Sequence, residues 1–513
     1  MRKTDIAVIG GGAACVAFLH HLVTAVDCAT AARVRVRIFE PRPRLGPGLA
    51  YQGDCAAVLL NRGAQTMSAS AHEAGAFAYW LRWKAMNAED LRPWVASDLG
   101  SAYVPRPVFG MFLEDFAVEV RKSALKKGLE VQVVHEEVVA IEKGARFHVQ
   151  SSEGSITADH VLLAMGSAGS FDAYGLSSAQ GYIHNPYPLQ PKLPALLKSS
   201  NVCIIGTGLT AVDVAVALKK AGYEGRIDMR SRSGRLPCVR GLQVRQHTLQ
   251  EATRCAVMTL AAKGPGKASL RELLRLLRAE LRSEGACWKH LFARHPDAQS
   301  RLRSQLTAEN QVVPWQLVLA STNEVIEQAW HSLSPVAQHL VLQRFHGDWM
   351  CRRAPMPWVN AKLLLDMMDS RQLRILKGGA SFTVVPAQGL IACDHLDSET
   401  RDHYQTVINA TGATRQISSD QDSALLRGLL RDGHAQADWR GGLQVDFATS
   451  SLVNAQGVPD PRLRVIGHLT CGTYFFVPSL EMIAKRAQCI AEQIRDDLQR
   501  SSAASADYVS EQP

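Results

Sequence analysis

The chain has 513 residues, of which 46% are hydrophobic and 20% charged, a composition that is typical of a folded protein with two or three domains. Its formal charge of +9 suits anionic ligands, but the arginines are dispersed and no nucleic-acid-binding motif occurs, so no nucleic-acid partner is expected. No run of about 18 apolar residues occurs, so neither a membrane-spanning helix nor a membrane partner is expected.

The N-terminal segment Asp5–Cys15 predicts a strand, a glycine-rich turn and a helix. An apolar run is followed by Gly10, Gly11 and Gly12. In a G-x-G-x-x-G fingerprint, the first glycine allows a tight turn, the second lets a pyrophosphate approach, and the third position takes a small residue for helix packing. Cys15 keeps that third position small. A pyrophosphate would rest on the N-terminus of the helix.

The next predicted strand, Arg33–Phe39, ends at Glu40. An acidic side chain at this place in a dinucleotide-binding unit hydrogen-bonds the ribose hydroxyls of an adenosine that lacks a 2′-phosphate. The spacing from Gly12 is long, which requires a longer first helix or loop. FAD and NAD would both fit this site.

A second fingerprint lies in Asn201–Ala211, where Gly206 and Gly208 follow a β-branched run. Ala211 takes the small third position. Two dinucleotide sites in one chain indicate electron transfer between the two cofactors, so the pair favours a flavoenzyme reduced by a nicotinamide. Two glycine-rich turns in an ordinary α/β sheet are the alternative.

The second unit has no acid at the end of its second predicted strand, Arg226–Arg230. Ser231 and Arg232 follow instead. Because a carboxylate would repel a 2′-phosphate and arginine and serine bind one, these residues predict NADPH, with Arg230 in support. A solvated basic turn is the alternative.

Two further apolar strands, in His160–Gly166 and Val407–Gly412, end in Ala-x-Gly. Such strands are typical of the crossings between the two domains, where a glycine lets the backbone turn close to a cofactor. Beyond the doubled fingerprint the sequence shows no repeat.

The chain has eleven cysteines and no C-x-x-C. The odd count and the spacing argue against a disulfide framework, a metal site and a redox-active dithiol. The cytoplasm is the expected location, and no metal is expected.

Several segments outside the fingerprints resemble a bacterial FAD/NAD(P)-binding flavoprotein family. The resemblance runs from about Asp5 to about Ile494, and that family is distantly similar to flavin-dependent N-hydroxylating monooxygenases. In the family, the first two of the matching segments line the flavin side. The matching segments are Gly46–Tyr51, Leu59–Asn61, Met67–Ser68, Val104–Gly110, Leu209–Asp213, Ser231–Pro237 and Ile466–Gly472.

Two segments depart from the family pattern. Thr473–Glu481 lacks the Trp-Glu pair that many relatives carry there, and Trp349–Pro357 lacks the histidines expected among its arginines. Both lie where a substrate pocket could be, so the departures affect the substrate more than the cofactors.

The resemblance and the two fingerprints together imply an FAD- and NADPH-dependent oxidoreductase. The favoured activity is that of a monooxygenase, which uses molecular oxygen to N-hydroxylate a small amine or amino acid through a flavin C4a-hydroperoxide. The alternatives are an NADPH-dependent reductase or dehydrogenase without oxygen insertion and a non-catalytic redox-sensing flavoprotein. The substrate and the oligomeric state do not follow from the sequence.

The cofactors would carry most of the chemistry. The candidate catalytic residues are Asn61, His184 and Tyr474, for which a turn cap, a surface-turn histidine and a core aromatic are the respective alternatives. The predicted cofactor-binding residues are Gly10, Gly11, Gly12, Glu40, Arg42, Gly48, Leu49, Asn61, Met67, Val138, Ala164, Gly166, Gly206, Gly208, Leu209, Thr210, Ser231, Arg232, Gly412 and Gly467.

The predicted fold class is α/β, with two Rossmann-like dinucleotide-binding domains. The FAD-binding domain is discontinuous, comprising residues 1–185 and 377–500. The NADPH-binding domain, residues 195–376, is inserted into it and carries a helical insertion at about 240–350. The chain is expected to end in a helix from about Ser479 to Leu498 and a disordered tail at 501–513.

Overall fold

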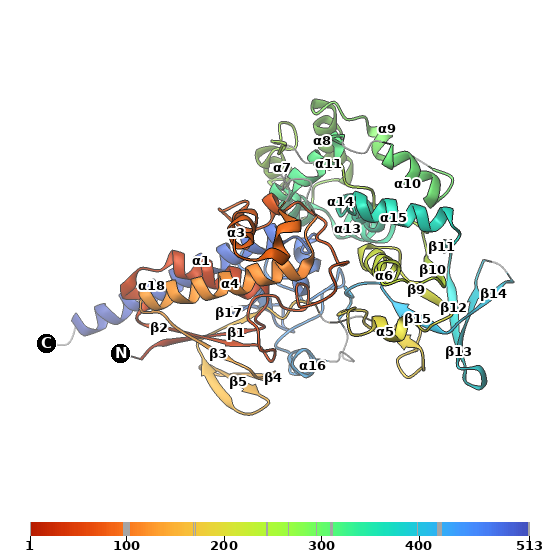
Figure 1. The fold of residues 1–513 in the computed structure, drawn as a ribbon. Helices are drawn as coiled ribbons and strands as arrows, with labels where there is room; N and C mark the ends of the chain where they lie inside the picture. The colour runs from red at the N-terminus through yellow and green to blue at the C-terminus, as the bar shows by residue number, and fades with distance from the viewer. Residues whose placement is uncertain are drawn as a thin grey trace.

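The structure is a computed structural model that describes residues 2–95, 103–167, 169, 171–242, 245–264, 266–293, 295–307, 311–397, 399–417 and 423–510; at residue 290 and residues 501–510 it describes the backbone alone. Two units built on parallel sheets lie side by side, and a group of helices covers the second unit at the top of the view in Figure 1. The predicted α/β fold class with two dinucleotide-binding domains is confirmed.

The first unit contains a six-stranded sheet with the order β16-β17-β7-β1-β2-β3. Its strands are parallel except for the pair β16 and β17, and the central ones are apolar because both faces of the sheet are covered. A three-stranded antiparallel sheet, β4-β5-β6, lies beside it. The strands are β1 (Thr4–Ile9), β2 (Val34–Phe39), β3 (Glu130–Val134), β4 (Val138–Lys143), β5 (Phe147–Ser151), β6 (Ser155–Ala158), β7 (His160–Leu163), β16 (Ser451–Val453) and β17 (Pro459–Val465).

The second unit contains a five-stranded parallel sheet with the order β11-β10-β9-β15-β8 and a three-stranded antiparallel sheet, β12-β13-β14. Its strands are β8 (Tyr182–Ile183), β9 (Asn201–Ile205), β10 (Arg226–Ser231), β11 (Leu373–Lys377), β12 (Ala380–Val385), β13 (Leu390–His395), β14 (Arg401–Tyr404) and β15 (Thr406–Asn409).

The two units repeat one topology. The order β3-β2-β1-β7 with the sheet β4-β5-β6 corresponds to β11-β10-β9-β15 with the sheet β12-β13-β14. This repeat extends well beyond the doubled fingerprint, to which the sequence similarity is confined. It also moves a boundary: residues 380–409 belong to the second unit, so the return to the first unit comes after β15 and not at residue 377.

Helices α1, α4 and α18 pack together on one face of the first sheet (Figure 1). Side chains of the antiparallel sheet β4-β5-β6 and of α16, which contacts β4, share a core with the other face. The short helix α2 accounts for the long spacing between the first fingerprint and the second strand. The helices of this unit are α1 (Ala13–Ala25), α2 (Cys28–Ala31), α3 (Ala76–Ala85), α4 (Arg106–Lys126), α16 (Ala424–Arg431), α17 (Cys471–Tyr474) and α18 (Leu480–Ser510).

Helices α5 (Leu193–Leu196), α6 (Leu209–Lys220) and α15 (Trp358–Asp369) belong to the second unit. The helical insertion lies between β10 and α15. Its helix α8 begins with a capping box formed by Ser269 and Glu272. The insertion comprises α7 (Arg254–Ala261), α8 (Leu270–Ser283), α9 (Trp288–Leu291), α10 (Ala298–Leu306), α11 (Pro314–Ser321), α12 (Ile326–Ser332), α13 (Pro335–Leu340) and α14 (His346–Arg353).

The C-terminal helix is longer than the sequence predicts. Its backbone remains helical through Ser510, over ten residues of the expected disordered tail; 511–513 lie outside the described residues. The alanines in this segment have the highest intrinsic helix propensity. No helix in the described part of the chain is long and apolar enough to cross a membrane.

Candidate dinucleotide sites and the junction between the units

The first glycine turn lies at the carboxyl edge of the first sheet, where β1 passes into α1. Gly10 has a φ of +100°, and a β-carbon there would lie 2.6 Å from the Ala164 carbonyl oxygen at the end of β7. A side chain is therefore excluded by both conformation and space. This glycine allows the tight turn between strand and helix.

The loop Gly46–Tyr51 is held between this turn and helix α4. The amide of Gly46 donates to the Gly11 carbonyl oxygen at 2.7 Å, and the α-carbon of Gly12 is 3.1 Å from where a β-carbon at Gly48 would be. On its other side the loop meets Gly110 of α4, where a β-carbon would clash with the Tyr51 carbonyl oxygen. These contacts explain why two separate motifs of the sequence carry glycine.

Glu40 lies at the end of β2, 1% exposed, beside the first glycine turn. Its carboxylate accepts from the Gly11 amide at 2.8 Å and from the Arg42 guanidinium at 2.8 and 3.0 Å. Burial alone would raise the pKa of Glu40, but the hydrogen bonds from Arg42 and Gly11 hold it below its usual value. Glu40 is thus ionised and adjacent to the turn, as a ribose-binding acid has to be.

The second glycine turn repeats the first at the carboxyl edge of the second sheet. Gly206 has a φ of +123°, and a β-carbon there would lie 2.5 Å from the Ala410 carbonyl oxygen at the end of β15. Ala164 and Ala410, each in a predicted Ala-x-Gly segment, therefore have the same role in the two units. The carboxyl ends of parallel strands are where open α/β sheets bind ligands.

Gly12 and Gly208, which directly precede α1 and α6, have no such local need for glycine. Their φ angles are −80° and −79°, which any residue can adopt. A β-carbon at Gly208 would have no atom within 4 Å, and one at Gly12 would make an ordinary contact with Gly48 at 3.5 Å. No side chain caps either helix, so no side-chain cap satisfies its first N–H groups. Both turns therefore fit a pyrophosphate.

The end of β10 carries the basic residues predicted to select the coenzyme. Arg232 is exposed. The Ser231 hydroxyl bonds Thr207 Oγ1 at 2.8 Å and accepts from the Gly234 amide at 3.1 Å. Arg230 does not join them: it is 3% exposed and donates to the Cys393 sulfur at 2.6 Å.

A pocket of about 710 Å³ opens beside this edge. Lys377, at the end of β11, and the loop Ser233–Pro237 line it. A β-carbon at Gly234 would lie 2.9 Å from that of Lys377, so the lysine is adjacent to the turn after β10. The local sequence does not indicate this lysine, because its proximity to the turn depends on the pairing of β10 with β11.

A partly buried ion pair joins the two units. Arg106, the first residue of α4, donates to Asp213 of α6 at 2.8 Å, and the Tyr187 hydroxyl bonds the same carboxylate at 2.5 Å. Arg106 also donates to the Leu59 carbonyl oxygen at 3.3 Å. Burial opposes the charge of Arg106, but Asp213 raises the pKa of the guanidinium above its usual value. The motif segments around Arg106 and Asp213 are therefore bound to each other.

The three candidate catalytic residues lie in different surroundings. Asn61 is half-buried in the loop after Leu59, and His184 directly follows β8. Tyr474 is 1% exposed, and its hydroxyl bonds Ser450 at 2.8 Å and the Phe447 carbonyl at 3.0 Å. Burial raises the pKa of Tyr474 to about 12. Its burial and its hydrogen bonds fit the core-aromatic alternative for Tyr474.

The remaining predicted cofactor residues lie mostly at the two carboxyl edges. Gly166, Gly412 and Gly467 follow β7, β15 and β17 with φ angles of +77°, +83° and +90°. Leu209 and Thr210 form the first turn of α6.

Three predicted residues lie elsewhere. Val138 at the start of β4 and Met67 are buried among apolar side chains, and Leu49 is 57% exposed. Val138 and Met67 thus contribute to the core of the first unit.

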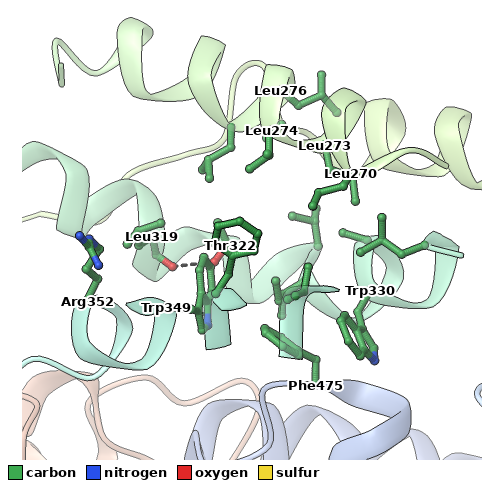
Figure 2. Close-up of a pocket in the computed structure, with 18 of the residues that line it drawn as sticks. Leu270, Leu273, Leu274, Leu276, Leu319, Thr322, Trp330, Trp349, Arg352 and Phe475 are labelled. Atoms are coloured by element: carbon green, nitrogen blue, oxygen red, sulfur yellow. Dashed lines mark hydrogen bonds between the residues drawn. The ribbon is translucent and has the colours of Figure 1, made fainter. Parts of the chain in front are cut away.

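An apolar cavity of about 450 Å³ lies within the insertion. Figure 2 shows leucines of α8 on one side, with Trp330, Trp349 and Phe475 on the other. Among its lining residues only a few, such as Thr322 and Arg352, are polar. The residues that line the cavity belong to other segments of the chain than the two glycine turns.

Comparisons with known proteins agree with this geometry. Residues 7–168 match the family model described as FAD-NAD(P)-binding, and no curated protein matches the chain. The fold is similar to that of the ornithine N-hydroxylase KtzI of Kutzneria sp. 744, whose structure holds reduced FAD, NADP+ and L-ornithine (14% identity, TM-score 0.53, covering 98% of this chain and 100% of that one). It is also similar to ornithine hydroxylase PvdA of Pseudomonas aeruginosa (15%, 0.53, 97% and 100%) and to L-lysine 6-monooxygenase of Pseudomonas syringae (14%, 0.53, 97% and 99%).

Residues 7–168 therefore match an FAD-NAD(P)-binding family model, and the chain as a whole has the fold of the flavoproteins with two dinucleotide-binding domains.

Proposed function

We propose that the protein is an FAD- and NADPH-dependent oxidoreductase, with FAD at the first glycine turn and NADPH at the second. The observation that carries this proposal is the pair of glycines Gly12 and Gly208. Neither is required by backbone conformation or by packing, so both are explained by a ligand that occupies the space of a side chain. When bound, the flavin would take a hydride from NADPH and pass the electrons to a second acceptor.

The residues of the chain would bind and orient the two cofactors. The first-turn amides of α1 would bind the FAD pyrophosphate, and Glu40 would accept hydrogen bonds from the adenosine ribose. The first-turn amides of α6 would bind the NADPH pyrophosphate. Arg106 and Asp213 would hold α4 and α6 together, and with them the two cofactors.

We infer further that the acceptor is molecular oxygen and that the protein hydroxylates a small amine or amino acid. Support comes from the fold shared with two ornithine hydroxylases and a lysine monooxygenase along nearly the whole chain. A reductase without oxygen insertion is the second candidate, and the oxygen reaction described below separates the two.

The purified protein is expected to be yellow and to contain FAD and not FMN, because Glu40 is positioned for a ribose of an adenosine moiety that FMN lacks. Heat release of the cofactor followed by chromatography checks this. A protein with FMN alone, or without flavin, would contradict the assignment of the first site.

NADPH is expected to reduce the flavin much better than NADH. Arg232→Ala and Lys377→Ala should each raise the KM for NADPH roughly 10- to 100-fold, since a hydrogen bond to a charged group contributes about 1.5–3 kcal/mol. The KM for NADH should stay nearly constant. Lys220→Ala, at the exposed far end of α6, is the control. Equal losses with both coenzymes would mean that these side chains hold the fold or the pyrophosphate.

Reduced protein mixed with oxygen in a stopped-flow instrument is expected to show a transient that absorbs to the blue of oxidised flavin. A suitable amine or amino acid should couple NADPH oxidation to a hydroxylated product, and Asn61→Ala should shorten the life of the transient. One-step reoxidation that yields only peroxide with a broad panel of amines would favour the reductase.

A further inference from the structure

Three arginines from distant parts of the chain meet at the junction of the first unit, the second unit and the insertion. Arg62 follows the loop of Asn61, Arg240 lies beyond β10, and Arg353 ends α14. Arg240 and Arg353 are each 8% exposed. Arg62 bonds Glu481, Glu481 bonds Asn323, and Asn323 bonds Arg353. The Arg240 amide donates to the carbonyl oxygen of Met356, three residues after Arg353, at 2.9 Å. The charges of neighbouring arginines in this group disfavour each other.

Arg240 has no side-chain partner among the described residues. Its Nε is fully buried and makes no hydrogen bond, and Tyr103 is the group that favours its charge. Burial, together with the charge of Arg62, lowers the pKa of Arg240 to about 10. A buried guanidinium without an acceptor is rare in folded proteins, because its desolvation is not offset.

Arg353 is only partly satisfied. One guanidinium nitrogen bonds Asn323 Oδ1, the group stacks on Phe476 at 4.5 Å, and Nε has no partner. Burial, together with the charges of Arg62 and Arg240, lowers the pKa of Arg353 to about 9.

One carboxylate, Glu481, lies among these cations. It pairs with Arg62 at 3.4 Å, with Lys485 at 2.9 Å and with Asn323 Nδ2 at 2.8 Å. It also favours the charge of Arg353, but one carboxylate cannot neutralise Arg62, Arg240, Arg353 and Lys485 together. The group therefore carries an excess of positive charge, of which Arg240 and Arg353 are buried.

We propose that Arg62, Arg240 and Arg353 form an anion-binding subsite that holds the acidic group of the substrate, a carboxylate or a phosphate. That the anion belongs to a substrate rests on the proposed function, whereas the binding of an anion by these arginines does not. Arginine binds both groups through paired hydrogen bonds. None of the three arginines lines the pocket beside Lys377 that we assign to the coenzyme, and Arg62 directly follows Asn61, which the family resemblance places on the flavin side.

The test uses the full-length, FAD-loaded, oxidised protein at low ionic strength, without NADPH. Malonate and inorganic phosphate are titrated separately, with the melting temperature and the flavin spectrum as readouts, so that the two arms distinguish a carboxylate from a phosphate. At least one anion should bind, and Arg240→Met should weaken it tenfold or more, with Arg240→Lys intermediate. Without anion, Arg240→Met should melt no lower than the wild type, since it removes an uncompensated buried charge.

Arg232→Met is the control for the coenzyme site, because it should weaken NADP+ and leave the malonate titration unchanged. Equal anion affinity in wild type and Arg240→Met overturns the proposal. The proposal is also overturned if NADP+ displaces the anion and if Arg240→Met weakens NADP+ by the same factor as it weakens the anion. The arginines would then bind a phosphate of the coenzyme. A failure of flavin reduction by NADPH would contradict the proposed function while leaving this titration intact.

Discussion

Gly208→Ala will bind FAD normally and lose reduction by NADPH. The new methyl group would occupy open space at the N-terminus of α6, where the coenzyme pyrophosphate is proposed to rest. Displacing a bound group by about 1 Å can reduce a rate roughly 100-fold, and we expect at least that loss in the rate of flavin reduction at a given NADPH concentration. Rapid mixing of NADPH with the oxidised protein measures it directly.

The stability of this variant should change little. Alanine at a compatible φ stabilises the folded protein by about 0.4–1 kcal/mol, because it lowers the conformational entropy of the unfolded chain. Alanine is also a poorer N-cap than glycine, which destabilises the helix, so the two effects oppose each other. Gly154→Ala, in the hairpin of β5 and β6 where a β-carbon also meets nothing within 4 Å, is the matched control. Gly206→Ala should instead lower the melting temperature, because that position has a φ of +123°. Normal flavin reduction in Gly208→Ala would remove the main support for the coenzyme site.

Features that depend on local sequence could be predicted. Both glycine turns and Glu40 lie at the predicted positions, because the succession of strand, turn and helix depends on residues that are neighbours in the chain. Glu40 at the end of β2 meets the Gly11 amide through the parallel pairing of β1 and β2. Gly412 likewise follows β15, as the local pattern of a strand and Ala-x-Gly predicts.

Features that depend on which face of a strand is covered could not be predicted. Along a strand, alternate side chains point to opposite faces. Arg230 shares a face of β10 with Asp228, and both are buried: Arg230 bonds Cys393, and Asp228 bonds Tyr404 and Arg374. The sequence around Arg230 reads as a basic strand end, and nothing in it indicates that the sheet β12-β13-β14 covers that face.

The arginine group at the junction is beyond local reasoning for another reason. Arg62, Arg240 and Arg353 are separated by more than a hundred residues at each step, and the topology alone brings them together. A weak signal was present, since Arg240 and Arg353 lie in apolar segments with no acid beside them. The departure from the family pattern at Trp349–Pro357 predicts a substrate pocket near Arg353, but nothing in the sequence connects Arg353 with the other two arginines.

The largest loss of stability is expected from Asp213→Leu. The change removes the acceptor of Arg106 and of the Tyr187 hydroxyl, and Asp213 is 3% exposed. Leaving a buried charge without its partner costs about 3–5 kcal/mol. For a unit of about 200 residues with an unfolding entropy of about 2.1 cal/mol/K per residue, that lowers the melting temperature by roughly 7–12 °C. A thermal scan of the FAD-loaded protein measures the shift.

Replacing both partners separates the loss of the pair from the loss of packing. Arg106→Met combined with Asp213→Leu should recover most of the melting temperature, because two apolar side chains of similar volume leave no uncompensated charge. Flavin reduction by NADPH should stay impaired in that double variant, since Arg106 also holds the Leu59 carbonyl of the loop that leads to Asn61. A melting temperature of Asp213→Leu within about 2 °C of the wild type would mean that apolar packing, and not this ion pair, holds the two units together.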